Sequence, residues 1–304
     1  MSPNHAVETK PFPLTDRLYG LVPVLVGLFF GSLFVFSASQ TLAATLSAEP
    51  SAAQPHMDQA LKSFQRGDFE QAVLSWTEAA RLYEAEQKPK EQGNALIHLA
   101  QSYQALGQYK EALKTLESSL ALAEKLGDRT QTAVALGALG NVYIAAGPPE
   151  MALKYLNEGL RIAREVNNQD LSAIILNNLG NLLTAQKKYS EALVAYRESV
   201  SLATARNNRS LLIGALVNEA TASIQMNQPR EAKALLDRAL DQIRAVEASH
   251  EKAVGLINIG LASDDLRSRL PDSTDSLLLL AHETLSEAGT LADSMGDRRT
   301  SSYA

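Results

Sequence analysis

Apolar and small residues recur along most of the chain with a period of 40 positions. One register holds leucine in five successive units, at Leu96, Leu136, Leu176, Leu216 and Leu256. A second holds only alanine or glycine, at Ala60, Ala100, Gly140, Gly180, Ala220 and Gly260. A third is always alanine (Ala72, Ala112, Ala152, Ala192 and Ala232), and a fourth is always large and apolar (Trp76, Leu116, Leu156, Tyr196 and Leu236). A fixed period of this kind predicts an array of structural repeats that pack on their neighbours.

Each unit is predicted to contain two helices. Residues 91–106 carry apolar side chains at helical spacing, and a second helix is expected over 109–125. Gly107 separates the two helices, and Gly127 ends the second, because glycine tolerates the left-handed residue that follows many helices. Asparagine stands in the place of Gly127 in the next two units. We expect the small register to let the helices of a pair approach closely, and the large register to fill the space between neighbouring pairs.

The string Leu99-Ala100-x-x-Tyr103…Gly107-x-Tyr109-x-x-Ala112…Leu116 resembles the tetratricopeptide repeat consensus, and the segments starting at Leu139 and Leu179 resemble it again. The usual period of that family is about 34 residues. A period of 40 implies longer helices, as in kinesin-light-chain-like arrays. The resemblance covers residues 57–304 and implies an all-α fold, a right-handed α-solenoid of about six helix-turn-helix repeats that binds protein or peptide segments.

A few positions depart from the repeat pattern. Pro149 and Pro229 replace the aromatic residue of the turn, at helix starts where proline is tolerated, and Glu219 replaces an apolar residue. In the sixth unit the alanine register returns only at Ala281, after a nine-residue insertion that we expect to form a surface loop. Residues 298–304 resemble the start of another first helix, so we expect the chain to stop inside a seventh repeat, with an uncapped end through which it can associate.

The N-terminal residues follow a different pattern. An uncharged apolar run over residues 21–36 is preceded by Lys10 and Arg17 and followed by small residues, with a small-x-small cleavage site at 41–43. This is the layout of a secretory signal peptide. Counted over 21–38, the run also approaches the lower length limit of a membrane span.

Three segments follow from these patterns. Residues 1–43 are expected to be a cleaved signal peptide or an uncleaved N-terminal membrane anchor, and both export the rest of the chain across a bacterial inner membrane. Residues 44–56 are small and polar, as in a flexible linker. Residues 57–304 form the repeat domain. The expected location is therefore periplasmic or secreted, with a tether to the inner membrane if the segment is retained.

Composition argues against several classes of chemistry. The net charge is −6, which disfavours nucleic-acid binding because phosphate contacts need clustered Lys and Arg. There is no cysteine, and the five histidines lie far apart in the sequence without metal-ligand spacing. We find no catalytic motif, and we expect no cofactor, no metal and no enzymatic activity.

The predicted first helices carry the candidate binding residues. The segments 131–146 and 171–186 contain no charge, whereas the second helices are rich in charge. Amide side chains recur in two registers of these first helices: Asn178, Asn218 and Asn258 with His98 in the same line, and Asn141 with Asn181. A side-chain amide donates and accepts hydrogen bonds, so it can pair with the backbone of any peptide. The alternative is that these amides bond to neighbouring helices as structural spacers.

Three functions remain open at this point. The favoured one is a scaffold that binds a peptide or protein segment on its concave face. The second is the sensing N-terminal region of a longer enzyme, since exported arrays of this type resemble the N-terminal halves of bacterial proteins that carry a CHAT-type protease domain. The third is a structural component of an envelope complex that stacks on itself.

Overall fold

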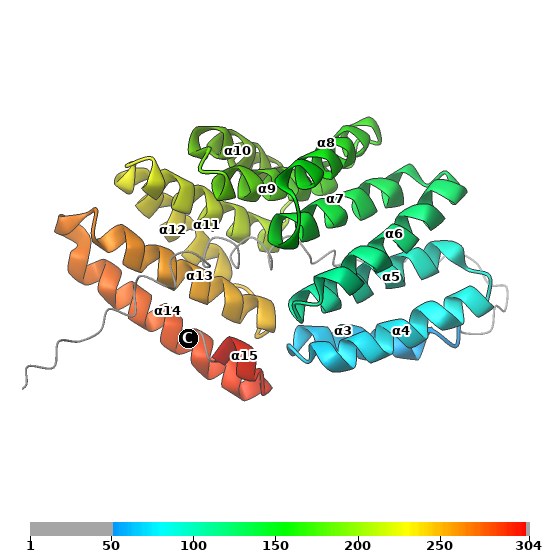
Figure 1. Ribbon diagram of the computed structural model, residues 1–304. Coiled ribbons are helices and arrows are strands. Elements are labelled where there is room, and N and C mark those ends of the chain that lie inside the picture. The colour runs from blue at the N-terminus through cyan, green and yellow to red at the C-terminus, as the bar shows by residue number, and fades with distance from the viewer. Residues whose placement is uncertain (1–50, 302–304) are drawn as a thin grey trace, which may run out of the picture.

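The computed structural model describes residues 51–301, which form helices and turns without any strand (Figure 1). The predicted signal or anchor segment, 1–43, lies outside the described residues. The predicted linker, 44–56, lies mostly outside them as well, and its last residues already belong to helix α3 (Gln54–Gln65). Ahead of that helix, the Ser51 hydroxyl donates a hydrogen bond of 2.7 Å to the Glu86 carboxylate.

Twelve helices of the described chain pack in sequence as six antiparallel pairs, which confirms the predicted all-α repeat solenoid. The pairs are α3 with α4 (Phe69–Ala85), α5 (Pro89–Ala105) with α6 (Tyr109–Leu126), α7 (Arg129–Ala146) with α8 (Pro149–Glu165), α9 (Gln169–Ala185) with α10 (Tyr189–Ala205), α11 (Arg209–Gln225) with α12 (Pro229–Ile243), and α13 (His250–Arg267) with α14 (Thr274–Met295). A short helix, α15 (Arg298–Ser301), follows.

The turns inside a pair and the turns between pairs have the same form. Most of them contain one residue in the left-handed region: Gly67, Gln87, Gly107, Gly127, Asn167, Lys187, Asn207 and Asn227. The residue after it is the N-cap of the next helix, and where that residue is Asp128, Asn168 or Asn208 its side chain accepts a hydrogen bond from a backbone N–H of the first turn. The glycine and asparagine stops that the sequence predicted are therefore confirmed at Gly127, Asn167 and Asn207.

The small and large registers meet inside each pair. A Cβ on Gly140 would lie 2.5 Å from Leu156 Cγ, and a Cβ on Gly180 would lie 2.3 Å from the Tyr196 ring. Each large side chain therefore packs against the backbone of the partner helix, where only a small residue leaves room. The large register also reaches the next pair, as expected: Trp76 stacks on His98 of α5, and Leu116 belongs to one core cluster with Leu139 and Val142 of α7.

The insertion of the sixth unit is mostly helical, which corrects the predicted surface loop. Helix α14 starts at Thr274, seven residues before Ala281, whereas α6 starts three residues before Ala112. The additional turn buries Leu277 in the core. Only residues 268–273 remain between the helices, and part of that connection is a 3-10 turn. Burial of Leu277 explains why this segment continues a helix instead of looping into solvent.

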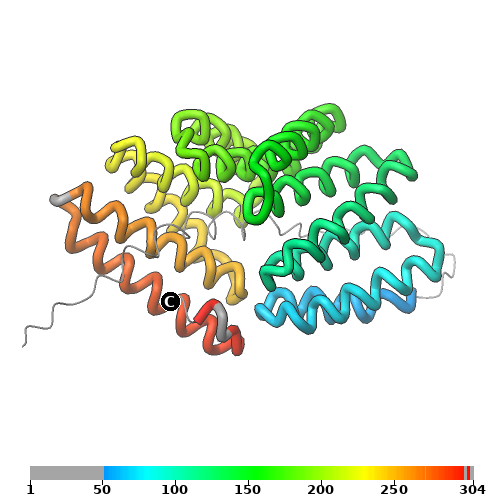
Figure 2. The backbone as a smooth tube through the Cα atoms, in the orientation of Figure 1, coloured from blue at the N-terminus to red at the C-terminus, as the bar shows by residue number. Residues whose placement is uncertain are grey.

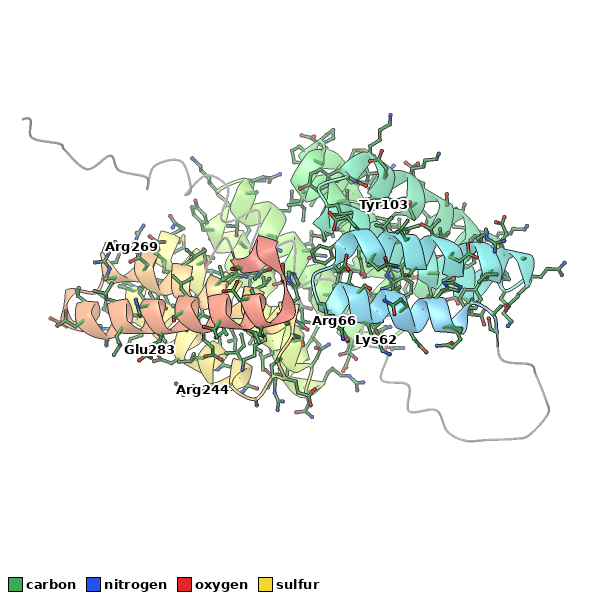
Figure 3. The ribbon with its side chains drawn as sticks, turned by 90° about the horizontal axis from the view of Figure 1, so that it is seen from below. Lys62, Arg66, Tyr103, Arg244, Arg269 and Glu283 are labelled. Carbon is green, nitrogen blue, oxygen red and sulfur yellow. The ribbon has the colours of Figure 1, made fainter. Side chains whose placement is uncertain are left out.

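The array curves until its first and last described repeats come into contact, and Figure 2 shows the tube bent into a ring whose two ends lie next to each other. Figure 3 shows the end of α3, marked by Lys62 and Arg66, beside α15. At this closure contact the rings of Phe69 and His250 meet edge to face at 5.2 Å. The Asp297 carboxylate sits so close to Gly67 that a Cβ there would stand 2.6 Å from its carboxyl carbon.

Candidate functional site

The first helix of each pair lines the inside of the ring (Figure 1). Helices α5, α7, α9, α11 and α13 pack on one another in succession, in addition to packing on their own partners. Elements on the inner side of a curved array lie closest together, so these contacts place the first helices on the concave face. The uncharged surfaces that the sequence assigned to this face therefore do lie there.

Charged side chains gather on the outside and at the helix ends, where they link neighbouring repeats. Arg164 pairs with Glu198 at 2.6 Å, and Arg197 pairs with Glu231 at 2.7 Å, in both cases between successive second helices. All four side chains are well exposed, so each pair stabilises the fold by less than about 1 kcal/mol. The convex surface is therefore charged, whereas the concave surface formed by α7 and α9 is not.

Two of the predicted asparagines are committed to the fold. Asn218 of α11 donates a hydrogen bond of 3.0 Å to the Asn177 side chain of α9, and both residues are buried. Asn181 accepts a hydrogen bond of 2.8 Å from the buried hydroxyl of Tyr196, and burial raises the pKa of that phenol. For Asn218 and Asn181 the structure thus shows the helix-to-helix contacts that the spacer alternative expected.

Asn141 and Asn178 are arranged differently. They line one small hollow of the concave face, about 30 Å³ in volume, between α5, α7 and α9. Both side chains are buried, yet neither Oδ1 atom has a hydrogen-bond partner among residues 51–301. A buried polar atom without a partner costs about 1–3 kcal/mol, which makes this pair a candidate for contact with a ligand.

Gln104 belongs to the same hollow, although the sequence interpretation did not include it. Its Nε2 atom is buried, again without a partner in the described chain, and Gln101 lies beside it in the lining. Gln101 shares a register with Asn141 and Asn181, and Gln104 follows it by one helical turn. The shared register was the signal that places Gln101 on the inner face, and the spacing of one helical turn was the signal that places Gln104 there.

Asn258 and His98 lie apart from the hollow. Asn258, on α13, is buried, and its Nδ2 atom has no partner within residues 51–301. His98, on α5, is half-buried and stacks on Trp76 at 4.8 Å between ring centroids, while its Nδ1 lies 2.9 Å from Gln101 Oε1. Burial lowers the pKa of His98, only partly offset by Gln101. Trp76 itself is buried in the core.

One buried carboxylate interrupts the apolar packing of the inner helices. Glu219 is only 5% exposed and accepts a hydrogen bond of 3.1 Å from Arg197 Nε. Burial raises the pKa of Glu219, and the Arg197 guanidinium opposes that shift without cancelling it.

Within the described residues there is no group of acidic or histidine side chains that is arranged to hold a metal ion. None of the helices of that range has the length and apolarity needed to cross a membrane.

The fold and its inner face define a helical-repeat solenoid of antiparallel helix pairs. The family model described as tetratricopeptide repeat matches residues 91–165 and 131–205, two windows offset by the 40-residue period. Residues 91–205 therefore match tetratricopeptide repeats, the family that the sequence resembles. No curated protein matches its sequence.

Solved structures share the fold at low sequence identity. A Rap protein complexed with competence and sporulation factor has a TM-score of 0.63 and 14% identity, over 84% of this chain and 74% of that one. BtubC (BKLC) from P. vanneervenii has a TM-score of 0.55 and 16% identity, over 81% and 93% of the two chains. The apo form of the quorum sensor NprR from B. thuringiensis has a TM-score of 0.55 and 16% identity, over 83% and 74%. At these identities the likeness is one of fold.

Proposed function

We propose that this chain is a non-catalytic scaffold that binds an extended peptide or protein segment along the concave face of its solenoid. The observation that carries the proposal is the concentration of buried amide atoms without partners on an uncharged inner surface, at Gln104, Asn141, Asn178 and Asn258. Amide groups at intervals along a groove suit a peptide backbone, whose own N–H and C=O groups also need partners. The right-handed superhelix implied by the family would guide such a segment along the ring.

The relatives in fold support this direction. One of them is a Rap protein solved in complex with competence and sporulation factor, and another is called a quorum sensor. At least one protein of this architecture therefore binds a partner, which supports the proposal that this chain does so. An exported location, periplasmic or secreted, is part of the proposal and rests on the sequence of residues 1–43.

The test is to select binding peptides from a random library with the full chain and to measure their affinity for asparagine variants. Asn141→Ala and Asn178→Ala should each weaken binding by about 0.5–1.5 kcal/mol while leaving the unfolding free energy nearly unchanged. Asn218→Ala is the contrasting variant, because its amide is already bonded to Asn177 and its loss should reduce stability. The proposal would be contradicted if no peptide is selected, or if the selected peptides bind the Asn141 and Asn178 variants as tightly as the parent chain.

A second candidate function, self-association through the C-terminal end of the array, is favoured by one observation. Leu278 and Leu279 on α14 are 50% and 58% exposed, next to each other on the outermost helix of the last pair. Adjacent exposed leucines of this kind are suited to a contact with another copy or another protein. Replacing both with serine should abolish any concentration-dependent assembly seen by light scattering, and an unchanged assembly would contradict this role.

A further inference from the structure

The hollow between α5, α7 and α9 combines three features that together restrict what can occupy it. Its polar atoms without a partner in the described chain are of two kinds, the oxygens of Asn141 and Asn178 and the Nε2 group of Gln104. Its lining contains no charged residue. Its volume is about 30 Å³, and its walls, among them Ile97 and Ile175, are buried.

The hydrogen-bonding atoms require an occupant that both donates and accepts. The two asparagine oxygens need N–H or O–H donors, and the glutamine nitrogen needs an acceptor. An ammonium or guanidinium group offers only donors, and a carboxylate offers only acceptors, so each would leave part of the set unpaired. A carboxamide offers both, because its NH2 group donates twice and its oxygen accepts.

The absence of charge from the lining argues in the same direction. An ionised group buried against isoleucine walls, without a counter-ion, would lose its hydration and gain no opposite charge in return. A neutral amide avoids that cost. The uncharged lining therefore favours a neutral polar ligand group over the side chains of Lys, Arg, Asp or Glu.

Size and depth decide between a backbone amide and a side-chain amide. A cavity needs roughly 10–15 Å³ for each water-sized group, so the hollow accommodates the tip of a side chain. The residues at its mouth, Gln101, Val134 and Ala138, are partly exposed, whereas Asn178 is 2% exposed. A peptide that runs along the concave face is held at the level of the mouth, and only a side chain that it sends inward reaches the deep amides.

We propose that this hollow is a specificity pocket for the primary carboxamide of a glutamine or asparagine side chain in the bound segment. The inference rests on the proposed function and deepens it: the amides along the face hold the segment, and this pocket selects one residue of it. A site that hydrogen-bonds a buried polar group discriminates strongly against analogues that lack the group, because its own atoms are then left unpaired.

The test uses four small probes that share one backbone and differ only in the side chain: the N-acetyl, N-methylamide derivatives of glutamine, glutamate, methionine and lysine. Each is titrated into the full chain labelled with 15N, and the side-chain NH2 signals of Gln104, Asn141 and Asn178 are followed by NMR. The glutamine derivative should shift these signals and bind at least about ten-fold more tightly than the other three. Because this selectivity is measured on the parent chain, the test does not depend on any variant folding.

Variants then locate the effect. Asn141→Ala and Asn178→Leu should remove the preference for glutamine, whereas Thr221→Val should retain it. Thr221 is a matched control, because it occupies the register of Asn141 two repeats further on and does not line the hollow. Circular dichroism establishes that each variant is folded.

Two outcomes would overturn the pocket. Equal binding of the four derivatives would mean that only their shared backbone is recognised, and binding of none of them would mean that the hollow takes no carboxamide. The proposed function fails separately, on the library selection. Library peptides could need Asn258 of this chain for binding and yet bind equally well after every Gln and Asn of the peptide is replaced. That result would support binding on the concave face and refute the carboxamide pocket.

Discussion

The Asp297 carboxylate rests against the backbone of Gly67, and this contact joins the last described repeat to the first. No side chain fits between the two residues, since a Cβ on Gly67 would lie 2.6 Å from both Cγ and Oδ2 of Asp297. Gly67 also has a φ of +77°, in the region that favours glycine. The same residue therefore ends α3 and makes room for ring closure.

Replacing Gly67 with alanine should open the ring. Gly107→Ala is the matched control, because Gly107 has a similar φ of +72° but open space around its Cβ position. Both variants should lose about 1 kcal/mol of stability from backbone strain, and only Gly67→Ala should increase the radius of gyration in small-angle X-ray scattering. An unchanged radius would show that the closure contact does not hold the ring.

The closure should also weaken in acid. Burial alone would raise the pKa of Asp297, but hydrogen bonds from His250 and Thr300 outweigh burial and hold the pKa below its ordinary value. A carboxyl group with a lowered pKa contributes stability above its unfolded pKa of about 3.9, and that contribution is lost as the pH falls through the lower folded value. Scattering measured below about pH 4 should therefore show ring expansion.

Asp297→Asn is the control for this titration. It has no carboxyl group to protonate, so its radius of gyration should show a weaker dependence on acid pH than that of the parent chain. If the variant and the parent expand identically, another group controls the opening.

Glu219 should destabilise the chain at neutral pH. Because burial raises its folded pKa, this group contributes most favourably when it is protonated, below its unfolded pKa, and loses that contribution as the pH rises through the folded value. Glu219→Leu restores the apolar residue found at Leu139 and Leu179. Arg197 is 51% exposed and keeps its pair with Glu231, so the substitution removes a buried charge without leaving another one unpaired and should stabilise the fold by about 1 kcal/mol. Urea unfolding should show this gain at pH 7, and the gain should shrink in acid. A loss of stability at pH 7 would mean that the pair with Arg197 outweighs the burial of the charge.

The fit of Gly180 to Tyr196 predicts a compensating pair of substitutions. Gly180→Leu should destabilise the chain by roughly 1–3 kcal/mol or more, because the added side chain overlaps the tyrosine ring. Gly180→Ala combined with Tyr196→Leu should be milder, since Ala100 and Leu116 hold the same positions in an earlier repeat. Thermal unfolding compares the variants, and equal losses would show that the two positions are not matched.

The repeat period made most of the fold predictable. The registers located the helix pairs, and Gly127 and Asn167 located two of the helix ends, because the left-handed conformation at these ends restricts which residues fit. The course of the insertion before Ala281 was not predictable in the same way. It became helical because Leu277 gained a place in the core, and a position in the core depends on the curvature of the whole array.

The sequence predicted which face of the array carries the candidate residues. It did not predict which of them bond to a neighbouring helix and which have no partner. Helical spacing placed Asn178 and Asn218 on the inner surface, but the two have the same residue type and the same register. What separates them is the partner on the neighbouring helix: Asn177 lies within reach of Asn218, while Asn178 Oδ1 is left facing the hollow. One period before Asn177 stands Gly137, which has no side chain to bond to Asn178. The repeat pattern does not say which registers of adjacent first helices meet, so this difference became visible only in the structure.

Closure of the ring bears on how fast a bound segment can leave. Phe69 contacts His250, and Asp297 contacts Gly67, so the first and last described repeats meet on one side of the ring. A segment bound on the concave face is therefore expected to leave lengthwise, or sideways after these contacts separate. Its residence time then depends on the size of its two ends as well as on its affinity. A segment with a folded domain at each end would be too wide to leave lengthwise. Its release would then require Asp297 to separate from Gly67.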